Sequence, residues 1–189
     1  MSRSIRSLVI AVVLFVLGAL LIGAGWTLRP IGEAQAAVQD GRLLQGLQSY
    51  SAAERRLTEI PLATRVVPAW YDAVVTNELA LMYALKRYDD VIDKSGATGA
   101  RGAKFWAGCA LFVKADLEDA PEKRMALLSE ALSAFRDAIQ ASPADFDAKY
   151  NYEVTSKLIA HVRQDPNAER PKDLNLVTPS SAKPPKKVG

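Results

Sequence analysis

The residues with the clearest chemical potential are a thiol and an imidazole that each occur once. Cys109 is the single cysteine and His161 the single histidine of the 189-residue chain. An imidazole can activate a thiol as a nucleophile, but these two fall on separate predicted helices without a supporting local motif. Cys109 also lies inside the apolar run WAGCALFV, which is typical of a buried small side chain. A single cysteine forms no intramolecular disulfide, so stability must come from packing.

A stretch of acidic residues is the second candidate for chemistry. Asp116, Glu118, Asp119 and Glu122 could offer carboxylates to a calcium ion. The sequence has no Asp-x-Asp-x-Asp-Gly loop with a closing glutamate, however, and residues 119–122 read Asp-Ala-Pro-Glu, the pattern of a helix start. We therefore interpret these acids as a helix-capping turn and predict no metal and no other cofactor.

Motifs for other reactions are also missing from the sequence. It contains no nucleophile elbow, phosphate-binding loop or zinc motif, so we predict that the protein is not an enzyme and has no small-molecule substrate. The net charge of +3 comes from Arg3, Arg6 and Arg29, which leaves 21 basic and 21 acidic side chains in residues 30–189. A balanced domain has no electrostatic footprint for nucleic acid, so we expect no nucleic-acid partner.

An apolar run near the N-terminus predicts a membrane anchor. Residues 8–28 carry no charge, and about 20 apolar residues suffice for a helix to cross a bilayer. Arg3 and Arg6 precede the run and Arg29 alone follows it, which favours a cytoplasmic N-terminus. We predict an anchor in residues 1–29, single-pass in a bacterial inner membrane, with the remaining chain in the periplasm.

A cleaved signal peptide is the alternative interpretation of the same run. Ala34-Gln35-Ala36 has the small-x-small pattern of a cleavage site, so that a mature chain would begin at Ala37. The apolar core of a signal peptide usually spans about 7 to 15 residues, which is shorter than this run.

Residues 30–163 predict an all-α domain, because no segment shows the sustained alternation of a strand. A linker at residues 29–32 leads into the first predicted helix, with a break near Gly46 as an alternative. The predicted helices cover residues 33–60, 68–85, 88–94, 101–116, 119–141 and 146–163.

The predicted helix at residues 68–85 has two apolar faces, which indicates packing between two neighbours. One face holds Val75, Leu79 and Met82, and the other holds Val74, Leu81 and Leu85.

The C-terminal residues, 164–189, predict a disordered or extended tail. They hold five of the ten prolines and end in SSAKPPKKVG. The simple interpretation is a solubilising appendage. The alternative is that Lys183, Lys186 and Lys187 dock on an acidic partner.

Small and aromatic residues follow the spacing of a tetratricopeptide repeat. Ala131, Phe135, Ala138 and Pro143 match its A-x3-F and downstream proline, and Gly108 matches the close-contact glycine of a first helix. Alanines let two helices approach while the aromatic ring fills the gap. We predict a degenerate repeat-like solenoid, with an irregular helical bundle as the alternative, because the interval between Gly108 and Ala131 does not fit a standard unit.

Such a solenoid presents a concave surface formed largely by the first helix of each pair. We predict an apolar and aromatic groove for protein partners, with ordinary packing between helices as the alternative role of each side chain. Its candidate residues are Tyr83, Phe105, Cys109, Phe112, Tyr150, Val154 and Lys157.

The apolar run, the repeat-like helices and the late block FRDAIQASPADFDAKYNYE together resemble the K proteins of methanol-oxidation (mxa) gene clusters. More loosely, they resemble repeat proteins of operons that encode von Willebrand A-domain proteins beside MoxR-type ATPases. The resemblance is specific over roughly residues 65–160. It implies an anchored periplasmic accessory factor that acts with A-domain partners in maturing methanol dehydrogenase, at the stage of calcium insertion. The alternative is a generic envelope scaffold unrelated to methanol oxidation.

Overall fold

The computed structural model describes residues 3–60, 63–66, 68–165 and 168–179, and within the N-terminal helix it places only part of the side chains. All regular elements in these ranges are helices, and the ranges contain no strand. The all-α prediction is therefore confirmed. Of the tail lysines, Lys183, Lys186 and Lys187 lie outside the described residues.

The first helix, α1 (Arg3–Gln39), runs without interruption through Pro30, so the predicted linker at residues 29–32 is wrong. Proline has no N–H to offer to the carbonyl four residues earlier, which is that of Trp26. A residue distant in sequence replaces this donor: Arg56 Nη1 donates to Trp26 O at 2.5 Å, and its guanidinium lies 4.3 Å from the centre of the Trp26 ring.

The chain then turns at residues 40–42 and enters α2 (Leu43–Glu59), so the break is not near Gly46. Gly41 supplies the turn with a φ of +75°, which an L side chain rarely adopts. Gly46 instead lies where α1 and α2 approach. A Cβ there would come within 2.8 Å of Val38 Cγ2, so Gly46 sets the separation of the two helices.

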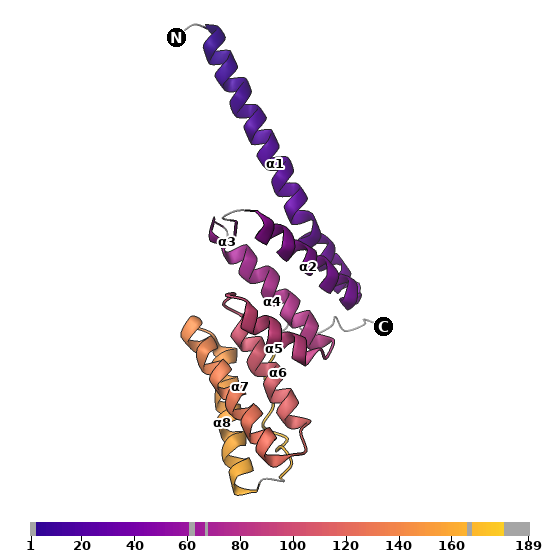
Figure 1. Cartoon of the computed structure of the whole chain (residues 1–189), viewed down its shortest axis with the longest axis vertical. Helices are drawn as coiled ribbons and strands as arrows, with labels where there is room; N and C mark the ends of the chain where they lie inside the picture. Colours follow the sequence, from indigo (N-terminus) through magenta and orange to yellow (C-terminus); the bar gives the residue numbers. More distant parts are fainter. Residues whose placement is uncertain (1–2, 61–62, 67, 166–167, 180–189) are drawn as a thin grey trace.

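The remaining helices form antiparallel pairs stacked along one axis (Figure 1). The end of α1 pairs with α2, α4 with α5, and α6 with α7, while α8 packs on α7 and closes the stack. The short α3 joins α2 to α4. The bounds are α3 (Ala63–Val66), α4 (Pro68–Ala84), α5 (Tyr88–Ala97), α6 (Ala103–Asp116), α7 (Pro121–Ala141) and α8 (Phe146–Gln164).

Helix α4 lies between two separate hydrophobic clusters, as its two apolar faces predicted. Val75 and Leu79 belong to the larger cluster with α5 to α8, whereas Val74 and Leu81 belong to the smaller one with α1 and α2. Helix α4 therefore packs on both the N-terminal hairpin and the rest of the domain.

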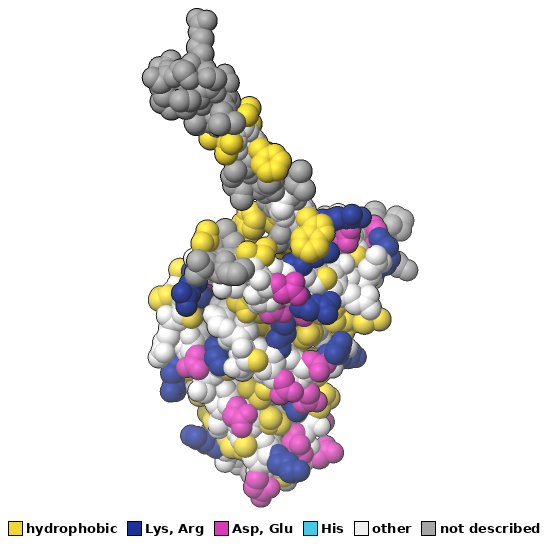
Figure 2. Space-filling model, turned by 45° about the horizontal axis from the view of Figure 1, so that its top comes forward, with side chains coloured by type: hydrophobic (Ala, Val, Ile, Leu, Met, Phe, Trp, Pro, Cys, Tyr) yellow, Lys and Arg dark blue, Asp and Glu magenta, His cyan; other side chains and the backbone are white. Residues whose placement is uncertain are grey.

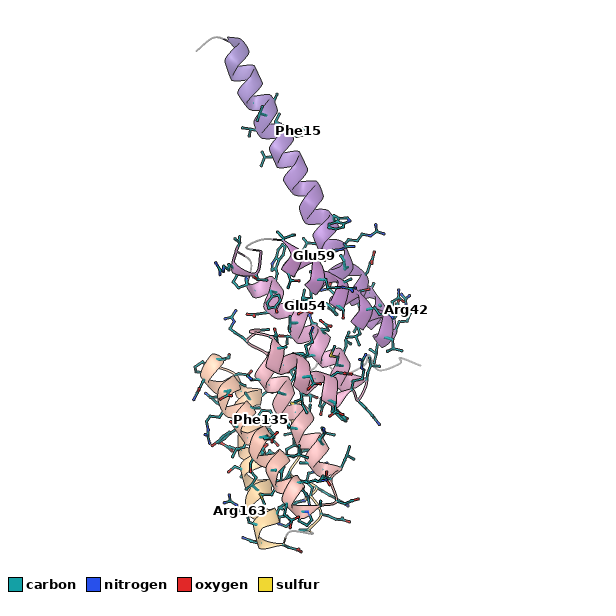
Figure 3. All side chains as sticks on the ribbon, in the orientation of Figure 1. Phe15, Arg42, Glu54, Glu59, Phe135 and Arg163 are labelled. Atoms are coloured by element: carbon teal, nitrogen blue, oxygen red, sulfur yellow. The ribbon has the colours of Figure 1, made fainter. Side chains whose placement is uncertain are left out.

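The contact between α6 and α7 depends on a glycine and an aromatic ring. A Cβ on Gly108 would lie 2.7 Å from Phe135 Cε1, which is closer than packed atoms allow. Phe135 is completely buried, and Figure 3 shows it on the α7 ribbon beside α6. The predicted roles of Gly108 and Phe135 are confirmed.

Ser142-Pro143-Ala144-Asp145 repeats the helix-start pattern of residues 119–122, but the residue that caps the following helix is Asp145 and not Ser142. The Asp145 carboxylate accepts from Ala148 N–H at 3.0 Å and caps α8. Helix α7 begins with Pro121 as expected, but its N-cap residue is Ala120, which has no side-chain cap. Asp119 therefore does not have the capping role that the sequence suggested.

The upper part of α1 stands clear of the domain. Its described large side chains are apolar and strongly exposed, with Phe15 79% exposed, whereas Lys, Arg, Asp and Glu are mixed over the domain (Figure 2). Within the described residues, no helix combines the length and the apolar character that crossing a membrane requires.

Candidate functional site: a groove along α1, α4 and α6

Three adjoining cavities follow one face of the helix stack. Asn77 of α4 lines all three, and Ala73 lines two of them. The first cavity, of about 370 Å³, lies between α4, α6 and the turn before α8; the others, of about 440 and 210 Å³, lie between α1, α2 and α4. We call this surface the α4 groove. Its small and polar residues on α4 are Asp72, Ala73, Thr76, Asn77 and Ala80, and Trp70, Val74 and Leu81 of the same helix also line it.

The α4 groove has small and polar side chains because α4 uses its other two faces for the core. At 100° per residue, these five residues cover one continuous side of the helix between the two apolar faces. The residues predicted for a groove do not include these five, because apolar and aromatic positions defined that prediction. The sequence pattern that indicates them is a third face of α4 made of small and polar residues, on a helix whose other two faces are apolar and packed.

An ion pair sets the position of α6 at one end of the α4 groove. Arg101 Nε lies 2.7 Å from Asp72 Oδ2, and the Arg101 N–H donates to Asp72 Oδ1 at 3.2 Å. Beside it, a Cβ on Gly102 would meet Thr76 Oγ1 at 2.5 Å, so only glycine permits this approach. The groove therefore combines a fixed charged end with a mixed lining, in which Phe105, Tyr50 and Trp70 add aromatic surface to the small and polar residues of α4. Such a surface suits recognition of a polypeptide.

The predicted groove residues are distributed over core and surface. Phe105 lines the cavity beside Asp72. Cys109 and Phe112 follow it on the same face of α6 but are 0% exposed, and Val154 is also in the core. These three side chains do not line an open surface, which corrects the prediction for them.

The other three candidates come from α4 and α8. Tyr83 is half-buried in an aromatic group, 5.5 Å from Tyr88 and 5.4 Å from Trp106 between ring centroids. Tyr150 packs half-buried on the larger cluster, and Lys157 is exposed on α8. The structure thus brings Phe105, Cys109 and Phe112 together on α6 but does not assemble all seven residues into one groove.

Residues 168–179, which we call the strap, cover the face of α6 that carries Cys109 and Phe112. Arg124 Nη1 donates to Ala168 O at 2.8 Å, and Arg170 lies 3.5 Å from Asp116 Oδ2, with its guanidinium 5.6 Å from the Phe112 ring centre. Leu174 and Leu176 pack half-buried on the larger cluster. Of the two forms expected for the tail, disordered or extended, these residues take the extended one and run back along α6 after α8 (Figure 1).

The end of the strap is held by a buried amide. Asn151 is 0% exposed; its Nδ2 donates to Val177 O at 2.9 Å, and its Oδ1 accepts from Val177 N–H at 2.8 Å. The same Nδ2 lies 3.8 Å from Cys109 Sγ. Asn151 has no local sequence signal for this role, because its partner lies 26 residues further on, in a segment with no secondary-structure pattern.

Cys109 and His161 do not form a catalytic pair. Burial raises the pKa of the Cys109 thiol, and the hydrogen bond from Asn151 offsets only part of that, so the thiol stays protonated near neutral pH. The neighbour of Cys109 on α8 is Asn151, and His161 lies ten residues further along this helix, about 15 Å away along its axis.

The acidic stretch lies at the other end of the strap. Asp116, Glu118 and Asp119 line a polar cavity of about 480 Å³ together with Arg124 and Arg170. Arg170 pairs with Asp116 at 3.5 Å, while Arg124 donates to Ala168 O, and a fourth acid, Glu169, also lines the cavity. Within the described ranges, no group of three or more His, Cys, Asp or Glu side chains could hold a metal ion.

A buried charged cluster joins α2, α4 and α5. Glu78, 2% exposed, accepts from Ser51 Oγ at 2.5 Å, and Lys94 Nζ lies 2.5 Å from Glu54 and 3.2 Å from Glu78. Burial raises the pKa of Glu78 more than Ser51 and Lys94 lower it. Burial alone would lower the pKa of Lys94, but its hydrogen bond to Glu54 and the charge of Glu78 outweigh that and raise it. The cluster faces the interior, so its role is to fix the packing of three helices.

The protein is therefore an all-α stack of helical hairpins with an open groove along α4 and an intrachain strap over α6. No family model, curated protein or solved structure matches the chain.

Proposed function

We propose that the protein is a scaffold that holds other proteins in its α4 groove. The observation that supports this most is the face of α4 from Asp72 to Ala80, which three adjoining cavities leave open between α1 and α6. Cys109 is buried, and the acidic stretch lies beside the strap and not in the α4 groove, so neither supplies a reactive group there. A recessed surface that combines small, polar and aromatic side chains is suited to binding a protein segment.

The proposed architecture is a degenerate tetratricopeptide-like solenoid. It is supported by the stacked hairpins and by the contact of Gly108 with Phe135, at the positions that the repeat pattern assigns to a close-contact glycine and a filling aromatic. In such solenoids the concave face formed by first helices binds partners, and here α4 and α6 would take that role.

The proposed location is a bacterial inner membrane, with α1 as a single-pass anchor and the domain in the periplasm. The uncharged run at residues 8–28 supports it, as do Ile10, Leu14 and Phe15, which are among the described side chains of α1 and are 59%, 63% and 79% exposed. Carbonate extraction of membranes, combined with protease access from the periplasmic side, tests this. A mature N-terminus at Ala37 by mass spectrometry would overturn the anchor.

The proposed process is the maturation of methanol dehydrogenase, at the stage of calcium insertion, with von Willebrand A-domain partners. This narrower proposal rests on the resemblance of the sequence to K proteins of methanol-oxidation clusters. A gene deletion tests it: growth on methanol should fail and recover with high calcium. Unimpaired growth in both media would favour the alternative, an envelope scaffold unrelated to methanol oxidation.

A pair of matched variants tests the scaffold itself. Asn77→Arg places a long cation where the three cavities meet, whereas Ser129→Arg places the same side chain on the exposed side of α7. After crosslinking in the native host, Asn77→Arg should lose captured partners and Ser129→Arg should keep them. Equal capture by both folded variants would exclude the α4 groove as the binding surface.

A further inference from the structure

The strap is bound in the manner of a separate peptide. Its hold on α8 runs through main-chain atoms, since the Asn151 amide bonds both the N–H and the C=O of Val177 while the Val177 side chain is 37% exposed. A side-chain amide that pairs with both groups of one residue recognises extended backbone of almost any sequence. Asn151 is therefore a reader of backbone.

Selectivity comes from the residues before Val177. Leu174 and Leu176 turn toward the hydrophobic cluster, whereas Asn175 between them is exposed. This alternation is that of an extended segment lying on a surface. Four residues before Leu174, Arg170 pairs with Asp116 and lies over the Phe112 ring. A turn separates the two parts, since Leu174 N–H donates to Pro171 O at 3.0 Å and Asn175 Nδ2 donates to Lys172 O. The bound pattern is thus a basic residue, a turn, and an extended stretch with two alternating apolar residues.

The site requires an occupant, because its polar atoms are buried. Asn151 is fully buried, and a buried amide without hydrogen-bond partners is costly. If the strap leaves, another extended backbone can restore the same two bonds. The short connection from α8 keeps the strap at high local concentration, so an incoming segment competes against an intramolecular one.

We propose that the face between α6 and α8 is a binding site for an extended segment of a partner protein, with the pattern basic-x3-apolar-x-apolar, and that the strap is its intrachain competitor. The inference deepens the proposed scaffold function and rests on it. It assigns that scaffold a second surface, distinct from the α4 groove, which is closed until the strap is displaced.

The probe is a fluorescent peptide with the sequence of residues 168–179, tested by anisotropy on the full chain in mild detergent. Leu174→Asp with Leu176→Asp should release the strap while leaving every helix unchanged. Lys172→Asp is the matched control, since it changes the net charge by the same two units at an exposed position of the strap. A chain ending at Asp165 provides a second released form.

Both released forms should bind the peptide at least about tenfold more tightly than the full chain and the control variant, because the tethered competitor is gone. Asn151→Ala in either released form should abolish this gain. The single thiol gives an independent readout: Cys109 should react faster with a disulfide reagent after release, and added peptide should slow it again.

Two results would overturn the inference: no peptide binding by a released form that keeps its helical circular dichroism, or equal binding by released form and full chain. If release unfolds the Asp165 chain, the double leucine variant alone decides between these outcomes. Loss of partner capture in Asn77→Arg would still support the scaffold, so the failure of this inference is separable from the failure of the proposed function.

Discussion

The guanidinium of Arg56 on α2 donates to the carbonyl of Trp26 on α1, 30 residues earlier, and lies against the Trp26 ring. Pro30 makes this bond necessary, since it cannot supply the N–H that the carbonyl would otherwise accept. One arginine thereby allows α1 to continue through a proline and at the same time joins it to α2.

A double-mutant cycle tests this relationship. Arg56→Ala should destabilise the chain by about 1 kcal/mol, because a carbonyl loses a charged donor. In a Pro30→Ala background the helix supplies its own N–H, so the same change should cost less. Denaturant unfolding of the four chains measures the coupling energy. Equal costs in both backgrounds would show that Arg56 does not replace the missing donor.

Gly108→Ala should lower stability by about 2 kcal/mol, because the new methyl group would overlap the Phe135 ring. Phe135→Leu in the same chain should recover part of the loss by making room. Gly96→Ala is the control, since a Cβ there meets nothing within 4 Å and alanine favours the helix. Thermal unfolding of the three variants reads out the effect, and an unaffected Gly108→Ala chain would contradict the close contact.

Lys94→Met should cost about 3 kcal/mol at pH 7, because it leaves Glu54 and buried Glu78 without their cation. The pKa of Glu78 is raised, so folding favours its protonated form; at pH 4 it takes up a proton and the penalty should shrink. Urea unfolding at the two pH values measures this. A penalty that grows in acid would refute the assignment.

The raised pKa of Lys94 predicts that the unmodified chain loses stability at alkaline pH. Its ion pairs stabilise the fold fully below the ordinary lysine pKa of 10.5, and this contribution is lost as pH rises through the higher folded value. Stability should therefore fall above about pH 10.5 more steeply than in Lys94→Met, which has no such group to titrate.

Two alanine substitutions distinguish the capped start of α8 from the uncapped start of α7. Asp145→Ala should destabilise the chain by about 1 kcal/mol, since it removes the acceptor for Ala148 N–H. Asp119→Ala should have little effect, because α7 begins at Pro121 without a side-chain cap. Chemical denaturation of both variants measures the difference; equal losses would mean that Asp119 caps α7 after all.

Local patterns predicted the part of the fold in which neighbours in sequence determine the structure. The two apolar faces of α4 indicated two packing partners, and the patterns around Gly108 and Phe135 each indicated a close contact between helices, although not that the two residues meet. Each of these features repeats with the period of a helix, so the sequence displays it directly.

Features that depend on distant partners could not be predicted in this way. Pro30 indicated a linker, because nothing near it in sequence reveals that Arg56 replaces the missing donor. The sequence did not show that the strap is held against α8, because its contact there depends on Asn151, 26 residues earlier. The α4 groove was not predicted for a different reason. Asn77 and Thr76 lie on a face of small and polar residues, and no apolar pattern marks such a face in the sequence.

The uninterrupted course of α1 from Arg3 to Gln39 gives the domain a fixed rotational phase relative to the N-terminal apolar segment. Each residue of a helix advances the rotation by about 100°, so one residue inserted between Trp26 and Pro30 would turn the α4 groove by that angle, and four would nearly restore it. If partners are held in the same membrane, capture should vary with the number of inserted residues in a helical period, whereas a domain on a flexible linker would be indifferent to it.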